Sequence, residues 1–435
     1  MMMMSRRAMN GLARLGRPTQ VAMAMSTKGQ NIEVQRMKLR DAPFEEVVYG
    51  NDVGIRTVTF NRPNVLNALN LPMIRSLTPK INKFERNPTV NAIIFEGAGE
   101  KAFCAGGDIR FLYENGKNPE TRHLALDFFR EEYRLNYTLA TMSTPVISII
   151  NGITMGGGVG LSMHGKFVVA TEKTTFAMPE TAIGFFPDVG GSYILPRIGR
   201  KIATQEKYTP LVSGADALVG QGLGTFLALT GERLKGAEVF GVALATHFVE
   251  SKELVDLRNH LVEFDFSPEV RQSMRDDIID ESIGDLETEV DETNQEFLST
   301  VEAVFGATAK DDTVEGIMAR LLALDTEWSR KIHTKLTKVS PLSLKVTLRQ
   351  MREGATKTAA ECFQMEFRMA TRMMENPDFF EGVRSVIIDK DNAPNWLHKS
   401  VEAVTDDEVD RFFQPLPEDE ELVLYTAAPA SDDEE

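Results

Sequence analysis

The chain has 435 residues, 42% of them hydrophobic and 26% charged, a composition typical of a globular protein. This length has room for roughly two or three domain-sized units, or for one large domain with appendages. Its formal net charge of −16 argues against direct binding to DNA or RNA, because nucleic acids require a basic protein surface. No run of about 18 apolar residues is present, so we expect no membrane span. The chain has 2 cysteines, too few for a disulfide framework.

The first 32 residues are basic and contain no acid. Arg6, Arg7, Arg14, Arg17 and Lys28 are spaced by serine, alanine and methionine. This pattern is typical of a mitochondrial transit peptide, with a disordered basic tail as the alternative reading. We therefore predict a transit peptide at residues 1–32 and a protein of the mitochondrial matrix.

The first half of the chain alternates predicted strands and helices. Residues 46–61 alternate in polarity around Asn51-Asp52, as a β-hairpin does. In the helix at 124–139, Phe128, Phe129 and Tyr133 are expected on the buried face. The remaining predicted elements are a helix at 67–86, buried strands at 91–97, 146–150 and 167–170, and a glycine-rich loop at 98–110. This alternation indicates an α/β fold with buried sheets.

The second half is predominantly helical in pattern. We expect helix over 227–247 with a turn at Thr230-Gly231, and acidic, peripheral helices over 263–315. A helical hairpin broken at Gly354 follows at 340–374. We predict a core domain at 45–250, a C-terminal helical region at 251–413 that includes segments 378–391 and 406–413, and an acidic tail at 414–435.

Several catalytic motifs are absent from the sequence. There is no G-x-S-x-G nucleophile motif, no phosphate-binding P-loop and no dinucleotide fingerprint, and the 6 histidines lack metal-ligand spacing. We expect no metal, and we interpret His164 as a packed histidine and not as a base. The remaining sources of chemistry are backbone N–H groups and carboxylates.

Two glycine-rich loops each follow a predicted buried strand. They span residues 103–108 and 155–158. Two N–H groups directed at one carbonyl oxygen would form an oxyanion hole, in which each donor contributes about 2.7–4 kcal/mol. The alternative is that the glycines only permit close packing of helix on strand.

Two carboxylates, Glu180 and Asp188, follow the second loop, each directly after a proline. They lie within an apolar stretch that includes Phe185 and Phe186, and burial there would raise their pKa values into a range suited to proton transfer. Capping of a helix over 189–195 is the competing interpretation for Asp188.

Over residues 47–413 the chain resembles the crotonase (enoyl-CoA hydratase/isomerase) superfamily. The motifs AFCAGGDIR (102–110) and GITMGGGVGLS (152–162) carry this resemblance. The motifs MPETAIGFFPDVGG (178–191), SPLSLKVTLRQ (340–350) and DFFEGVRSVIIDKD (378–391) are similar to those of its 3-hydroxyisobutyryl-CoA hydrolase branch, which serves valine breakdown.

The resemblance implies a spiral of β-β-α units followed by C-terminal helices. It implies that the N–H groups of Gly107 and Gly157 hold the thioester oxyanion and that Glu180 and Asp188 are the catalytic carboxylates. It also places Glu132 against the substrate. No separate cofactor is expected, because coenzyme A is part of the acyl-CoA substrate.

The resemblance further implies that coenzyme A passes the segments 64–69 and 103–105, with Leu66, Ala68, Phe103 and Ala105 as its contacts. Enoyl-CoA hydratases carry a second glutamate where this chain has Gly160. The missing glutamate favours hydrolysis of the thioester over hydration of a double bond.

Two other functions remain as alternatives. One is an enoyl-CoA hydratase or isomerase, and the other is a non-enzymatic component of the mitochondrial ribosome. About twenty residues between Arg197 and Phe226 are additional to the family pattern. We interpret them as a surface insertion, with a lid or a contact for a partner as the alternative. The protein is also considered as a possible homo-oligomer.

Overall fold

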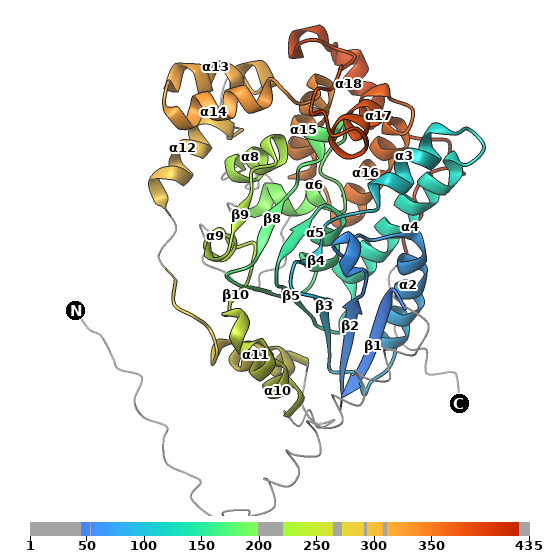
Figure 1. Ribbon diagram of the computed structural model, residues 1–435, viewed down its shortest axis with the longest axis vertical. Helices are drawn as coiled ribbons and strands as arrows, with labels where there is room; N and C mark the ends of the chain where they lie inside the picture. Colours follow the sequence, from blue (N-terminus) through green and yellow to red (C-terminus); the bar gives the residue numbers. More distant parts are fainter. Residues whose placement is uncertain are drawn as a thin grey trace, which may run out of the picture. The chain divides into compact units, whose positions relative to one another are not determined.

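The computed structural model describes residues 45–52, 54–198, 221–263, 272–290, 294–307 and 311–425 (Figure 1). The predicted transit peptide, most of the insertion after Arg197 and the last ten residues of the acidic tail lie outside these residues. From residue 46 onward the described chain forms one compact unit. The domain boundaries themselves remain predictions.

A six-stranded sheet forms the first layer of the fold. Its strands β1 and β2 form an antiparallel hairpin, and the rest of the sheet is parallel. The strand order is β1 (Val47–Asp52), β2 (Ile55–Phe60), β3 (Ala92–Gly97), β5 (Val146–Ile150), β7 (Phe167–Ala170) and β10 (His247–Phe248). The predicted hairpin is confirmed, but its turn lies after Asp52, since Asn51 and Asp52 still pair with the second strand.

A second, four-stranded sheet was missed from the sequence. Its order is β4 (Ala102–Cys104), β6 (Ile153–Met155), β8 (Thr175–Ala177) and β9 (Leu234–Lys235). The prediction of loop over 98–110 is therefore wrong at β4. Strands of two or three residues are too short for an alternating pattern to be detected.

The two sheets are built from repeated pairs of strands. The pairs β3–β4, β5–β6 and β7–β8 each place one strand in the first sheet and the next strand in the second. A helix follows each pair, namely α3 (Ile109–Lys117), α5 (Gly157–Ser162) and the 3₁₀ turn η2 (Glu180–Ile183). This is the spiral of β-β-α units that the resemblance implied.

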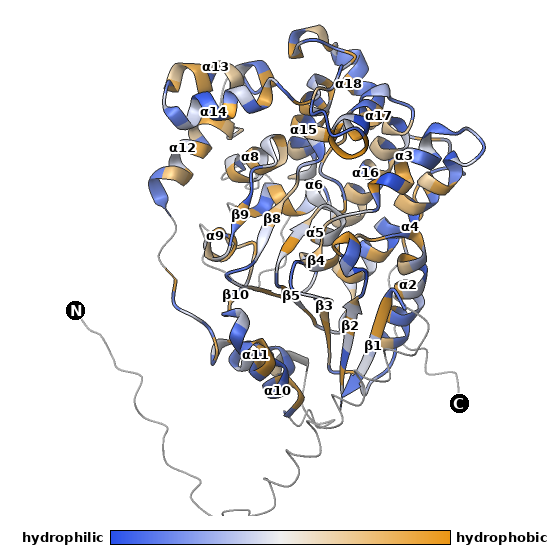
Figure 2. Ribbon diagram, viewed as in Figure 1, coloured by the Kyte–Doolittle hydropathy of each residue, from blue (hydrophilic) through white to orange (hydrophobic). Residues whose placement is uncertain are grey.

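Helices cover both faces of the first sheet. On one face, Ile94, Ile147 and Val169 pack with Leu257 of α10 (Leu254–Glu263) and Ile279 of α11 (Gln272–Gly284). The opposite face packs against the larger core, which includes α2 (Leu71–Glu85) and α4 (Arg122–Thr141). Figure 2 shows β3 in the orange of hydrophobic residues, as expected for a strand buried on both faces.

Two predicted helices differ from the structure at their ends. The helix expected from residue 67 begins at Leu71, because Leu66 and Asn67 have left-handed φ angles of 55° and 56° and the Asn70 side chain caps Met73 N. Within the helical segment expected over 227–247, the turn predicted at Thr230-Gly231 is confirmed, but the helix after it ends at Gly241 and does not reach His247. Helix α8 (Gly222–Thr230) ends at Gly231 with φ 56°, and a short α9 (Ala237–Gly241) precedes β10.

The C-terminal region is helical, as predicted. The hairpin is confirmed as α15 (Pro341–Gly354) and α16 (Ala359–Met373). The expectation of peripheral helices over 263–315 is wrong for α12 (Gln295–Phe305), which buries Val301, Val304 and Phe305 and packs on α8. The remaining elements are α6 (Gly191–Ile194), α13 (Val314–Leu324), α14 (Glu327–Leu336), α17 (Pro377–Val383), the π-helical turn η6 (Arg384–Ile388), α18 (Asp406–Phe413) and short 3₁₀ turns at Pro63–Val65, Leu195–Arg197, Ser251–Glu253 and Val401–Ala403. No helix within the described ranges is long and apolar enough to cross a membrane.

Candidate active site

The second sheet brings together three segments that are far apart in the chain. Strands β4, β6 and β8 are parallel neighbours, so their carboxyl ends lie along one edge. The residues that follow them are Ala105–Gly107, Gly156–Gly157 and Pro179–Glu180. All of these line a single cavity of about 700 Å³. The glycine loops and Glu180 therefore meet because of the sheet that the sequence pattern did not reveal.

The two glycine loops contact each other closely. A Cβ atom on Gly157 would lie 3.1 Å from Gly107 N and 2.7 Å from Glu132 Oε1, so position 157 cannot carry a side chain without displacing its neighbours. Gly156, with φ 46°, turns the chain into α5. Among the described residues, no protein group accepts a hydrogen bond from the N–H of Gly107 or Gly157. Both donors thus remain available to a ligand.

Glu180 begins the η2 turn and lies beside the second glycine loop. A Cβ atom on Gly156 would be 2.9 Å from Glu180 Oε1, and the carboxylate is 7% exposed. Its Oε2 is buried with no hydrogen-bond partner in the described chain. Burial, followed by the nearby charge of Asp188, raises the pKa of Glu180 well above its ordinary value. A carboxyl with a raised pKa is a stronger base than an exposed glutamate and suits proton transfer.

Asp188 lies in the loop before α6 and faces helix α4. The Tyr133 hydroxyl donates a 2.8 Å hydrogen bond to Asp188 Oδ2. Burial raises the pKa of Asp188 to about 7, while the hydrogen bond from Tyr133 opposes that rise. The alternative role of Asp188 as a helix cap is wrong, because Gly190, which has no side chain, is the N-cap of α6.

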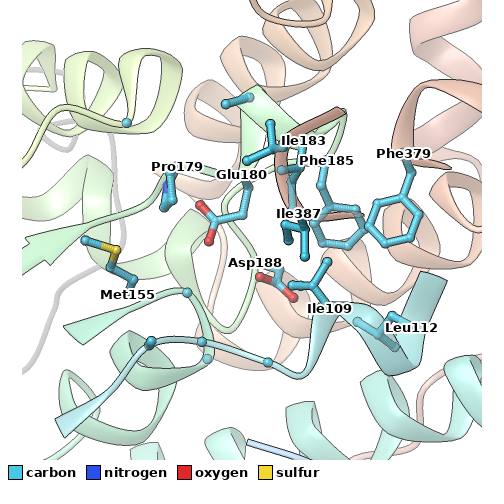
Figure 3. Close-up of a pocket in the computed structure, with 18 of the residues that line it drawn as sticks. Ile109, Leu112, Met155, Pro179, Glu180, Ile183, Phe185, Asp188, Phe379 and Ile387 are labelled. Atoms are coloured by element: carbon cyan, nitrogen blue, oxygen red, sulfur yellow. The ribbon is translucent and has the colours of Figure 1, made fainter. Parts of the chain in front are cut away.

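Glu132 completes the buried carboxylates of the cavity. It is 2% exposed on α4, and its Oε1 has no hydrogen-bond partner in the described chain. Burial first, and then the charge of Asp188, raise its pKa well above the ordinary value. Figure 3 shows the side chains of Glu180 and Asp188 among the residues that line the cavity.

Aromatic and aliphatic side chains close one end of the cavity. The rings of Phe129 and Phe185 stack at 5.4 Å, and Phe379 lies 5.5 Å from Phe185. Ile109 and Leu112 extend this wall (Figure 3). Polar and charged residues line another part of the cavity, namely Thr230, Glu232, Arg233, Lys235 and Lys335. The cavity therefore suits a ligand with a short apolar group at one end and a charged portion at the other.

The predicted coenzyme A contacts lie only partly at the cavity. Ala105 lines it, whereas Leu66, Ala68 and Phe103 do not. The Phe103 ring is fully buried and packs 5.2 Å from Phe60, because its strand β4 lies inside the fold. The N–H of Ala105 donates to the Leu66 carbonyl, which joins the two segments that contain these residues. Their role in binding coenzyme A stays a prediction.

His164 is a packed side chain, as the sequence analysis interpreted it. Its Nε2 donates to the Val189 carbonyl at 2.8 Å, and burial lowers the pKa of His164 to about 4. It holds the loop that follows Asp188 and does not line the cavity.

Three residues that contact the Asp188 loop were not predicted as functional. Tyr133 was expected only to be buried, and Glu366 and Gln350 come from the C-terminal helices. Glu366 accepts hydrogen bonds from Gly190 N and Ser192 N, and Gln350 donates to the Pro187 carbonyl. No local motif could indicate them, because each contact joins residues more than 50 positions apart.

The fold and this arrangement of glycine loops and carboxylates define a class of protein. The sequence profile of the enoyl-CoA hydratase/isomerase family matches residues 55–413, and the chain belongs to that family. Among solved structures, a carnitinyl-CoA dehydratase from Mycobacterium thermoresistibile aligns with 87% of this chain and 99% of its own (TM-score 0.74, 29% identity). An enoyl-CoA hydratase from Rhodobacter sphaeroides aligns with 87% of this chain and all of its own (TM-score 0.71, 30% identity).

The curated sequence relatives share one enzyme name, whereas the two structural neighbours have different ones. The chain is 42% identical to the mitochondrial 3-hydroxyisobutyryl-CoA hydrolase of Gallus gallus, over 85% of this chain and 89% of that protein. It is 42% identical to the Homo sapiens protein of the same name, over 88% of this chain and 92% of that one. The resemblance found in the sequence motifs is thereby confirmed.

Proposed function

We propose that this protein hydrolyses 3-hydroxyisobutyryl-CoA to 3-hydroxyisobutyrate and coenzyme A in valine breakdown. The observation that carries the proposal is the position of Glu180, a buried carboxylate whose Oε2 has no hydrogen-bond partner among the described residues, beside the two glycine loops. Within the same described residues, the N–H groups of Gly107 and Gly157 in these loops have no acceptor. The relatives named 3-hydroxyisobutyryl-CoA hydrolase support the choice of substrate.

In this mechanism the thioester carbonyl oxygen accepts hydrogen bonds from the N–H groups of Gly107 and Gly157. These donors stabilise the negative charge that develops on the oxygen when the carbonyl carbon is attacked, by about 2.7–4 kcal/mol each. The C–S bond then breaks, and the coenzyme A thiolate leaves with a proton. One water molecule is consumed, and its oxygen enters either the product acid directly or the Glu180 carboxylate, according to the route of attack.

Glu180 supplies the attack by one of two routes. It either attacks the carbonyl carbon itself, forming an anhydride that water then opens, or removes a proton from an attacking water. Single turnover in ¹⁸O-labelled water distinguishes the routes. Label enters the Glu180 carboxylate when water opens the anhydride at the enzyme's carbonyl, and it enters only the product in the general-base route.

Asp188 and Glu132 have supporting roles in the proposal. Asp188, held by Tyr133, orients the 3-hydroxyl group or the water and raises the pKa of Glu180. Glu132 lies against the second glycine loop and contacts the acyl group.

The test of the function is release of free thiol from 3-hydroxyisobutyryl-CoA by the purified protein. We expect catalytic turnover that falls when the 3-hydroxyl is removed from the substrate, as in isobutyryl-CoA. Absence of thiol release above the uncatalysed rate would refute the proposal.

We further propose that the protein acts in the mitochondrial matrix, which is supported by the basic, acid-free N-terminal segment and by the mitochondrial names of its relatives. Homo-oligomer formation and association with the mitochondrial ribosome remain predictions. Sedimentation of a mitochondrial lysate distinguishes them, because ribosome association places the protein in the ribosomal fractions and a free oligomer remains near the top of the gradient.

A further inference from the structure

A strained turn follows Asp188 directly. Val189 has a φ of 54°, a left-handed conformation that β-branched residues rarely adopt and that costs about 1–3 kcal/mol. Gly190 continues the turn with φ 86°. Such a conformation persists only when neighbouring groups hold it in place.

One buried carboxylate from the C-terminal helices holds this turn. Glu366, on α16, is completely buried. Its Oε2 accepts from Gly190 N at 2.7 Å, and its Oε1 accepts from Ser192 N at 2.9 Å and from Ser192 Oγ at 2.5 Å. These three donors belong to the residues immediately beyond Val189. The carboxylate thus takes the place of a helix cap for α6, which has no capping side chain of its own.

The same helix also supports the other partner of Asp188. The Tyr133 ring, whose hydroxyl donates to Asp188, lies 6.2 Å from Phe363 and 6.4 Å from Phe367. Phe363 precedes Glu366 by about one helical turn, and Phe367 follows it directly in the sequence. Helix α16 therefore fixes Asp188 from two directions, through the backbone of its loop and through its side-chain partner.

We propose that Glu366 is a positioning residue for Asp188 in thioester hydrolysis, acting through the Val189–Gly190 turn. This inference rests on the proposed function. Burial raises the pKa of Glu366 to about 8, its three hydrogen bonds oppose that rise, and the charge of Asp188 adds to it, so the two carboxylates lie within electrostatic reach of each other.

The substitution Glu366→Gln tests the proposal, because an amide nitrogen cannot accept from Gly190 or Ser192. We expect kcat to fall about tenfold to a hundredfold, with KM within about threefold of wild type, since small displacements of a catalytic group have costs of this size. When Asp188→Asn is already present, adding Glu366→Gln should change kcat by less than about twofold, because Glu366 acts through Asp188.

Glu302→Gln is the matched control. Glu302 Oε2, on α12, also accepts from a backbone N–H at the start of a helix, that of Gly222 at 2.8 Å, but Glu302 does not line the cavity. This variant should retain wild-type kcat even where its thermal midpoint falls as far as that of Glu366→Gln.

Three results would overturn the inference. The first is a wild-type kcat for Glu366→Gln. The second is a Glu366→Gln substitution that lowers kcat as much in the Asp188→Asn background as in wild type. The third is a Glu302→Gln variant that loses as much kcat as Glu366→Gln does. If Glu366→Gln does not fold, Ser192→Ala removes only the hydroxyl donor. Ser192→Ala should lower kcat about threefold to tenfold in the wild-type background and leave kcat unchanged in the Asp188→Asn background. A wild-type kcat for Ser192→Ala would refute the inference. A wild-type enzyme that releases no thiol refutes the proposed function instead, and the inference with it.

Discussion

Val189 occupies the space beside Gly160. A Cβ atom on Gly160 would lie 2.6 Å from Val189 Cβ and 2.9 Å from Asn136 Nδ2, so the position has no room for any side chain. The left-handed turn after Asp188 places Val189 there. The glutamate that enoyl-CoA hydratases carry at this position is thus replaced by the loop that carries Asp188.

Gly160→Glu should therefore destabilise the protein without creating a hydratase. We expect a loss of at least about 1–3 kcal/mol, because both close neighbours are buried and packed. Thermal unfolding and hydration of crotonyl-CoA are the measurements. Gly284→Glu is the control, since nothing lies within 4 Å of its Cβ position. A stable Gly160→Glu protein that hydrates crotonyl-CoA would contradict this reading of the site.

Removal of the Tyr133 hydroxyl should weaken catalysis. In Tyr133→Phe, Asp188 loses its hydrogen bond, and the pKa of Asp188 rises because that bond lowers it. We expect kcat to fall about tenfold with little change in KM, since a misoriented group has a cost of this order. Tyr137→Phe, on the same helix and also packed against Phe363, should have wild-type kinetics. Equal effects of the two substitutions would argue for a packing role alone.

The charge of Asp188 should be visible in the pH profile of kcat/KM. Glu180 must be ionised to act, so activity rises with pH through its elevated pKa. Asp188→Asn removes a negative charge that raises this pKa, so the acid limb should move to lower pH. Burial is the larger cause of the raised Glu180 pKa and is still present in this variant. The acid limb should therefore stay above the pH range in which an ordinary glutamate titrates. Asp312→Asn, at a distant ion pair with Arg352, should leave it unchanged. A limb that moves to higher pH would contradict the assignment.

Burial of Glu180 should also reduce stability at neutral pH. A carboxyl whose pKa is raised by folding contributes stability below its unfolded pKa and loses that contribution as pH rises through the folded value. Glutamine does not titrate, so Glu180→Gln should unfold at a higher temperature than wild type, and the difference should grow from pH 5 to pH 8. Each unit of pKa shift corresponds to about 1.4 kcal/mol. A difference that shrinks with rising pH would show that Glu180 is not buried in this way.

The catalytic loops were predictable because their residue types are unusual and contiguous. Gly107, Gly157 and Glu180 stand out in glycine-rich or proline-rich sequence after buried strands, and the structure brings them together. The second sheet that does so was not predictable, since strands of two or three residues have no periodicity. Tyr133, Gln350 and Glu366 were also missed as partners of the Asp188 loop, because their contacts depend on how distant helices pack.

The most direct test of the account compares thiol release from 3-hydroxyisobutyryl-CoA with hydration of crotonyl-CoA, using wild type and Glu180→Gln. The account predicts that wild type releases thiol with catalytic turnover and hydrates crotonyl-CoA at least about a hundredfold less efficiently. It also predicts that Glu180→Gln lowers thiol release about a thousandfold, with KM within about threefold, as expected when an interaction made only in the transition state is lost. Efficient hydration by wild type, or thiol release by Glu180→Gln at the wild-type rate, would contradict the account.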